Sequence, residues 1–439
     1  MDNLPDNEKK PRSVLRSRNF FLLFLGTIVS NIGSTLYSFA VSFYILKITQ
    51  NNALLQGIYL AVCGVVFVLF SVVGGVLADR WDKVKIVYGS DFIKGFAILI
   101  SAVIIYISIQ NGSVTTQLIV LFCMGILSNI IAAIFSPATS ALIPAIVEQN
   151  QLQQANSLFS VLQSLQSLIG IVLAGVLYAA LPITVLFAVI GICFVCSGLS
   201  EIFIKAHHVR VDSPLSLKYV LCDFREGIRY MRPQKALVTM LFGVLFVNFF
   251  LSPFISNAQP FFFRTFLADG NYLFHEFLTP EMWSSVMSVC TCLGSLLMGM
   301  ILGQRSAPEK CGRVMVRWLL LTAIMFSGVV VSFFLFAQSG LSLNTHLLLS
   351  CLLLFLVGAC TVNVNVPFIT FVHRTVDSDK MAKVMSLTNI GSMGLTPLAS
   401  FIGGVLISSL GLYSVYIFCA VGMLITAVTL YTSKNVDNL

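Results

Sequence analysis

A run of charged and small residues at the end of the second apolar stretch could form electrostatic contacts between helices. Gly75, Asp79, Arg80 and Lys83 stand in the segment GVLADRWDKVK, and Asp91 follows inside the next apolar stretch. Asp79 can face a cation or the positive end of a neighbouring helix, and Arg80 can pair with a carboxylate such as Asp91. We interpret the group as a charged latch that holds two helices together in one state. The alternative is an ordinary charged loop.

Uncharged polar side chains recur near the centres of the apolar stretches. An unpaired amide in hydrocarbon is costly, so such a side chain normally faces a cavity or a partner helix. The candidate substrate contacts are Asn31, Tyr37, Asn129, Gln163, Gln166, Asn248, Asn363 and Asn389. For each amide taken alone, a hydrogen bond between helices is an equally good explanation.

The sequence lacks the residue clusters that are typical of active sites and metal centres. Cys193 with Cys196 and Cys290 with Cys292 have neither a nearby His nor a second Cys pair, so they do not indicate a metal site. We interpret the cysteines as packing residues. We expect no catalytic residue, no metal and no cofactor.

The elements that must position these residues are membrane-spanning helices. Apolar residues make up 57% of the 439 and charged residues 10%, which is more apolar surface than a soluble domain could bury. A bilayer span needs roughly 20 mostly uncharged residues. The predicted spans are 20–46, 54–77, 86–109, 117–136, 157–180, 183–204, 237–262, 282–304, 315–337, 345–367, 384–410 and 413–432.

The positive charges predict how these spans are oriented, because Lys and Arg in short loops are retained in the cytoplasm. With the N-terminus inside, nearly all of the 26 Lys and Arg fall in loops or span ends on the cytoplasmic side. The exceptions are Lys47, Lys94 and Arg264. Both termini are therefore predicted to be cytoplasmic. The net charge of +8 reflects this topology and not nucleic-acid binding, because the basic residues are spread over several loops.

The chain divides into two halves joined by a linker. Residues 1–204 and 237–439 each carry six predicted spans, and 205–236 is the widest gap between spans. Within this linker, the apolar pattern from Ser216 to Met231 predicts an amphipathic helix on the cytoplasmic membrane surface. A helix that binds a partner protein is the alternative.

The two halves also resemble each other in sequence. The segments from Pro137 to Gly175 and from Pro367 to Gly404 each contain a proline that closes a span, a polar loop, a Ser-Leu helix entry and a pair of small residues. Parallel repeats of this kind build one class of secondary transporters, with the substrate site near the midplane between the halves. We therefore predict an all-α membrane protein with two six-helix bundles around a central cavity.

The charged motif resembles the signature of the major facilitator superfamily. Gly75, Asp79, Arg80 and Lys83 match its G-x-x-x-D-R-x-x-R/K pattern. The similarity covers nearly the whole chain. In that fold the first, fourth, seventh and tenth helices line the cavity, which favours Asn31, Asn129, Asn248 and Asn363 as substrate contacts.

Finer features are similar to the macrolide-efflux branch of drug:proton antiporters. They include the DRWDKVK run, the G-x-x-x-S-x-x-G pattern formed by Gly26, Ser30 and Gly33, and the FSPA run at 135–138. The chain also resembles siderophore exporters and lysophospholipid transporters. It departs from many proton-coupled exporters because the span 117–136 contains no Arg.

The resemblance implies proton antiport, for which a carrier usually needs a buried carboxylate that titrates as access alternates. Among the 18 acidic residues, only Asp91 and Glu201 fall within predicted spans, both near cytoplasmic ends. Asp91 together with Asp79 is the predicted titrating group. The alternative is that both carboxylates are purely structural.

The implied function is export of bulky amphipathic drugs or natural products, as in macrolide resistance, by a monomer in the bacterial inner membrane. A cavity with amides, aromatic rings and no central charge favours an amphipathic or weakly cationic solute. A siderophore exporter and a lysophospholipid translocator are the alternatives. We predict that Asp79→Asn lowers transport and leaves membrane insertion intact.

Overall fold

The computed structural model describes residues 14–148, 151–205, 225–226, 228–303, 311–377, 384, 388 and 394–433. The first half contains a short 3-10 turn, η1 (Val14–Arg16), and six helices. These are α1 (Arg18–Ile48), α2 (Ala53–Arg80), α3 (Lys83–Gln110), α4 (Val114–Ile146), α5 (Leu152–Ala180) and α6 (Ile183–Glu201).

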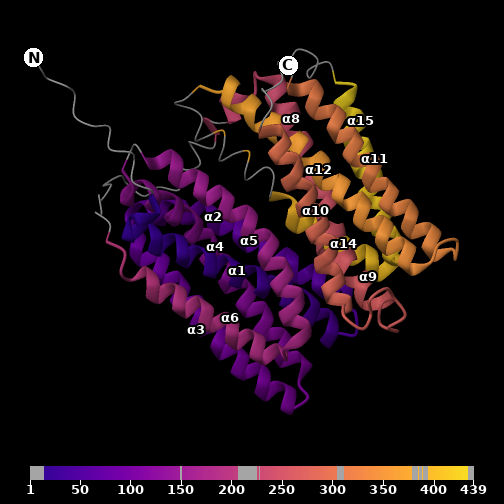
Figure 1. Cartoon of the computed structure of the whole chain (residues 1–439), viewed down its shortest axis with the longest axis horizontal. Coiled ribbons are helices and arrows are strands. Elements are labelled where there is room, and N and C mark those ends of the chain that lie inside the picture. Colours follow the sequence, from indigo (N-terminus) through magenta and orange to yellow (C-terminus); the bar gives the residue numbers. More distant parts are fainter. Residues whose placement is uncertain are drawn as a thin grey trace, which may run out of the picture.

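The second half begins at α8 and ends with α15, close to the C-terminus. Its elements are α8 (Lys235–Pro253), η3 (Phe254–Ala258), α9 (Gln259–Phe266), α10 (Pro280–Gly303), α11 (Cys311–Ala337), α12 (Leu343–Thr375), α14 (Thr396–Leu410) and α15 (Leu412–Tyr431). The two halves lie side by side (Figure 1).

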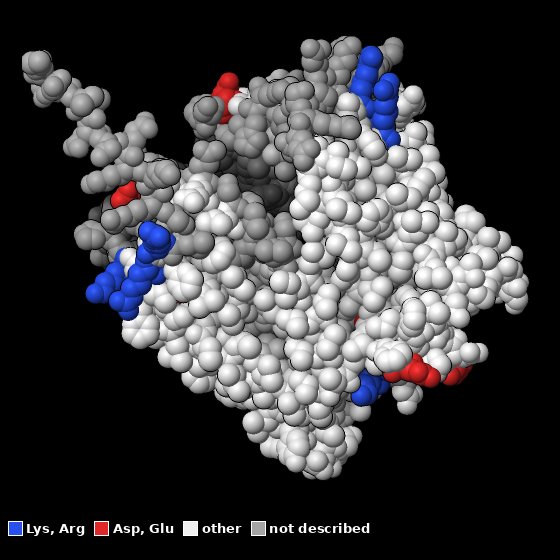
Figure 2. Space-filling model, viewed as in Figure 1, with Lys and Arg blue, Asp and Glu red and all other residues white. Residues whose placement is uncertain are grey.

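The helices account for the predicted membrane spans. Among the described residues, ten are long and apolar enough to cross a membrane, with α8, η3 and α9 forming one continuous span. Two further apolar helical segments, Leu168–Ala180 and Thr396–Leu410, are shorter within the described part of the chain. Together they give twelve transmembrane helices. The charged side chains visible in Figure 2 gather at the helix ends and leave an uncharged surface between them.

Two of the predicted span ends are wrong, because prolines do not close these helices. α4 continues through Pro137 to Ile146, and α12 continues through Pro367 to Thr375. Proline is tolerated inside membrane helices when neighbouring helices and side chains satisfy the freed backbone groups. Most of the predicted linker helix from Ser216 to Met231 lies outside the described residues, and its last turn is helical where described.

The halves meet along two helix pairs, α2 with α14 and α5 with α10. A Cβ atom on Gly57 of α2 would lie 2.9 Å from the Cα of Gly404 of α14, so this contact depends on glycine. A Cβ atom on Gly175 of α5 would likewise clash with the Ser285 side chain of α10. The final glycine of each sequence repeat therefore occupies the equivalent contact between the halves.

A π-helical turn interrupts the first span of the second half. Pro253 lacks an N–H and its ring clashes with the preceding turn, which loosens the helix where η3 begins. The turn directs the carbonyl oxygen of Ser256 toward the first half, where it accepts a hydrogen bond of 3.1 Å from the Gln56 side chain. Such turns are frequent at functional sites.

Candidate functional site

Two neighbouring cavities lie between the halves. The first has a volume of about 460 Å³ and the second about 480 Å³. Ser34, Ser38, Leu60 and Ser256 line both of them, so the two cavities form one continuous region along α1. Their walls come from α1, α2 and α5 of the first half and from η3, α10 and α14 of the second, among other elements.

Hydroxyl groups on one face of α1 line this region. Ser34, Ser38 and Ser42 recur at four-residue steps, which places them on the same side of a helix. Ser256, Ser284 and Ser288 approach the first cavity from the second half. The region therefore offers many small hydrogen-bonding groups within an otherwise apolar interface.

Half of the predicted substrate contacts line these cavities. Asn31 and Gln166 line the first cavity, and the buried carbonyl oxygen of the Gln166 side chain has no hydrogen-bond partner. Tyr37 and Asn129 line the second cavity. The Asn129 amide donates to the Gly125 carbonyl oxygen at 2.8 Å, within its own helix.

The other predicted contacts lie elsewhere or outside the described side chains. Asn248 of α8 lines neither cavity, and the buried Asn363 donates to the Ala359 carbonyl oxygen of its own helix at 2.9 Å. The Gln163 side chain and the whole of Asn389 lie outside the described residues. Their role stays a prediction.

Asp91 lies at the centre of a buried hydrogen-bond network between α1, α3 and α6. Its carboxylate accepts a hydrogen bond from the Ser30 hydroxyl. The Ser30 oxygen also lies 2.8 Å from the Ser197 hydroxyl, which donates to the Gly26 carbonyl oxygen at 2.8 Å. Asp91 is 3% exposed, so this network supplies the polar partners that a buried carboxylate requires.

Glu201 is a second buried acid beside this network. Its side chain is fully buried, and neither carboxyl oxygen has a hydrogen-bond partner. It packs against the backbone of α1, where a Cβ atom on Gly26 would lie 2.5 Å from Oε1 of Glu201. Glu201 also interacts electrostatically with Asp91. Two acidic groups therefore share one interior site.

The three residues of the first-span pattern all serve this site. Gly26 leaves room for Glu201, Ser30 binds Asp91, and Gly33 allows the ring of Phe194 to approach α1. The spacing of three and four residues aligns them on the face of α1 that packs against α6. The pattern is visible in the sequence, whereas the partners of its residues appear only in the tertiary structure.

Lys94 overturns the expectation of a cavity without a central charge. This lysine of α3 is 7% exposed and lines the second cavity. Its ammonium donates a hydrogen bond of 2.9 Å to the Ser34 hydroxyl and lies 4.4 Å from the ring centroid of Phe194. The sequence contains a signal for this position, because Lys94 is the one basic residue inside a predicted span and away from its ends.

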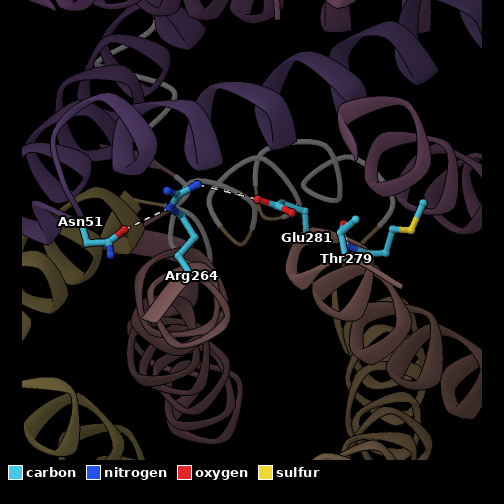
Figure 3. A network of polar contacts seen from close by, with 5 residues as sticks. Asn51, Arg264, Thr279 and Glu281 are labelled. Carbon is cyan, nitrogen blue, oxygen red and sulfur yellow. Dashed lines mark hydrogen bonds and ion pairs between the residues drawn. The ribbon is translucent and has the colours of Figure 1, made fainter. Parts of the chain in front are cut away.

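A polar contact joins the halves at the end of the molecule where α1 ends and α2 begins, which we term the distal end. Nε of Arg264 donates to Oδ1 of Asn51 at 3.0 Å, and the guanidinium forms an ion pair of 3.7 Å with Glu281 (Figure 3). Asn51 has a φ of 64°, in a tight turn that presents its side chain to the second half. Thr279 caps the start of α10 by accepting from the Met282 amide at 3.4 Å.

The fold, the paired halves and the cavity between them are those of a known transporter family. A family model described as Major Facilitator Superfamily matches residues 23–397. The chain belongs to the Major Facilitator Superfamily.

Comparison of sequences finds transporters among the relatives of this chain. An uncharacterised MFS-type transporter of Bacillus subtilis, YkuC, is 23% identical over 300 residues, which are 66% of this chain and 65% of that protein. The match thus spans just under two thirds of that relative. Macrolide efflux protein A of Streptococcus pyogenes is 25% identical over 380 residues, 84% of each chain.

A solved structure has the same fold. The bacterial homologue of the iron transporter ferroportin in its inward-facing state matches with a TM-score of 0.70 and 17% identity. The match covers 96% of this chain and 99% of that one. At this level of identity the likeness concerns the fold.

The superfamily signature lies where α2 passes into α3. Gly75, Asp79 and Arg80 belong to the last turns of α2, and their side chains lie outside the described residues. Lys83 is the first residue of α3, and Asp82 caps that helix by accepting from the Val84 amide at 3.0 Å. The latch between Arg80 and an acid stays a prediction.

Proposed function

We propose that this superfamily member exports bulky amphipathic small molecules, drugs or natural products, from a bacterial cell by alternating access. One observation carries the proposal: the cavity region between the halves, lined by hydroxyl and amide groups from both halves and by aromatic rings from the first half. Pockets of a few hundred Å³ with scattered polar groups suit an organic solute of this size. The chain is proposed to act as a monomer, because the cavity lies between its own halves. It is also proposed to be a transporter and not an enzyme.

The orientation in the membrane is proposed from the distribution of charge and contacts, and the direction of transport from the similarity to macrolide efflux protein A. Basic residues favour cytoplasmic termini, which would place the distal end outside an inner membrane. At the distal end the halves are joined by the contact between Arg264 and Asn51. A carrier closed outside and loaded from the cytoplasm is the state that an exporter uses to collect its substrate. The similarity to macrolide efflux protein A makes a macrolide the first substrate to test.

Proton antiport is proposed to drive this export, with Asp91 and Glu201 as the proton carriers. Neighbouring buried carboxyls are costly to ionise together, so such a pair can bind and release a proton as its surroundings change. Both acids touch α1, Asp91 through Ser30 and Glu201 through Gly26. Because α1 also lines the cavities, a movement of α1 would link proton binding to substrate access.

The test measures accumulation of a labelled macrolide in drug-sensitive bacteria that produce the chain, with and without a protonophore. Export predicts lower accumulation than in empty cells, and proton coupling predicts that the protonophore abolishes the difference. Asp91→Asn should do the same as the protonophore, whereas Glu148→Gln, at an exposed acid, serves as the matched control. Accumulation equal to that of empty cells would reject macrolide export.

A further inference from the structure

Lys94 is the one formally charged side chain among the described residues that line the two cavities. Its described contacts are the Ser34 hydroxyl at 2.9 Å and the ring of Phe194, whose centroid lies 4.4 Å from Nζ. A ring face attracts a cation, and the hydroxyl accepts one of the three ammonium N–H donors. Donor capacity therefore remains for a group in the cavity.

The nearest acid on the same helix does not neutralise Lys94 by direct contact. Within the described part of the chain, no carboxylate forms an ion pair with Lys94. Asp91, one helical turn away, accepts from Ser30 and lines neither cavity. The negative charge of Asp91 favours the charged form of Lys94 by a Coulombic interaction. On the side of the cavity, the Lys94 ammonium has no anionic partner among the described residues.

Further hydrogen-bonding groups around the second cavity lack partners. The Ser128 hydroxyl, on a side chain that is 7% exposed, lines the cavity and makes no hydrogen bond. The buried Tyr37 hydroxyl lies beside Tyr59 and makes no well-formed hydrogen bond. Unpaired buried hydroxyls are costly, so a ligand that accepts from them would relieve the cost.

The second cavity also has apolar wall residues. Leu60, Phe67 and Val68 of α2 and Pro397 of α14 contribute to its wall. The first cavity, which shares Leu60, adds the ring of Phe39. A ligand that fills this region therefore needs an apolar body as well as one group that accepts hydrogen bonds from a cation.

We infer that Lys94 is an anion anchor, so the preferred substrate is an amphipathic molecule that carries a carboxylate or a phosphate. The inference rests on the proposed function and specifies the charge of its substrate. The anionic group binds the Lys94 ammonium in the second cavity, and the apolar body extends along α1 into the first. An amine at the same position would meet the ammonium with like charge and bind more weakly.

The test uses steroids with one body and different end groups, bound to the purified full-length protein in detergent. Cholate carries a carboxylate, cholamide an uncharged amide, and the corresponding 24-aminocholane an amine. A second pair, lysophosphatidic acid and monoacylglycerol with the same acyl chain, replaces the carboxylate with a phosphate. Lys94→Gln removes the charge and Lys94→Arg retains it. Lys47→Gln, at an exposed lysine of α1, is the matched control.

The expected result is that the anionic member of at least one set binds roughly tenfold to a hundredfold more tightly than its uncharged counterpart. The set that shows the preference identifies the anion as a carboxylate or a phosphate. Lys94→Gln should remove this preference without changing the affinity for the uncharged member, and Lys94→Arg should largely restore it. Unchanged binding of the uncharged member also shows that the variant is folded.

Two results would overturn the anchor: no anionic preference in either set, or a preference that survives Lys94→Gln. Its failure can be separated from failure of the proposed export. Cells that export a macrolide through a protein without anionic preference would refute the anchor alone. A preference that depends on Lys94, in a protein that lowers accumulation of none of these compounds in cells, would support the anchor and refute export.

Discussion

In the first half, helices α1, α3 and α6 enclose Asp91, Lys94 and Glu201, whereas the second half encloses aromatic rings. The charged residues that are buried in the described part of the chain all belong to the first half. In the second half, the buried ring of Phe333 stacks on Tyr416 with 4.2 Å between centroids. Two bundles of related sequence pattern and the same fold thus carry different interiors.

A buried histidine of the second half shows the same contrast. His346 is 1% exposed, lies within 2.9 Å of the Ser332 hydroxyl, and packs among the rings of Phe262, Phe333 and Phe336. It lines neither cavity. We infer that the buried charges of the first half serve transport, whereas the packed rings of the second half stabilise its fold.

The largest expected effect is on the packing of the second half. Phe333→Ala removes a fully buried ring and should lower the free energy of unfolding by about 3–5 kcal/mol. Thermal unfolding of the purified protein would measure the loss. Phe96→Ala, at a ring that is 54% exposed, is the control and should change the midpoint little. Equal losses for the two variants would contradict a stabilising aromatic core.

A smaller loss of stability is expected at the charged site of the first half. Gly26→Ala places a methyl group 2.5 Å from Oε1 of Glu201, and overpacking of this kind costs roughly 1–3 kcal/mol. Gly89→Ala is the matched control, because a Cβ atom there meets nothing within 4 Å. The difference between their unfolding midpoints tests the contact. Identical midpoints would show that Glu201 does not pack on α1.

The charged site is expected to matter more for transport than for stability. Glu201→Gln keeps the size of the side chain but cannot release a proton, so we expect proton-driven export to fall at least about tenfold, or roughly 1.4 kcal/mol of coupling free energy. The measurement is transport into or out of liposomes with an imposed pH gradient. Normal coupling in Glu201→Gln would confine the proton site to Asp91 or remove it from this cluster.

The smallest expected effect concerns the contact that joins the two halves. Arg264→Gln removes the guanidinium that binds Asn51 and Glu281, which should shift the balance between conformations by about 0.5–1.5 kcal/mol. Spin labels at the exposed Asn111 and Gln338, in the distal loops of the two halves and in a cysteine-free background, would report longer distances. An unchanged distance distribution would show that other contacts close the distal end.

The polar positions of the cavity could be predicted from the sequence only in part. Asn31, Gln166, Tyr37 and Asn129 line the cavities, and their contact with a substrate stays a prediction. Asn363 lines neither cavity, although its amide donates within its own helix just as that of Asn129 does. A single sequence shows that an amide is costly in hydrocarbon but does not show which of its possible partners it meets.

The sequence by itself determined the membrane helices, the two halves and the family. These depend on the length of apolar stretches, on repeated spacing and on a local motif, all of which are properties of neighbouring residues. Only the tertiary structure decided that Lys94 reaches the cavity, that Glu201 lies against Gly26, and that Arg264 binds Asn51. Each of these contacts joins residues on different helices, and the packing angles and rotations of helices are set by the whole assembly.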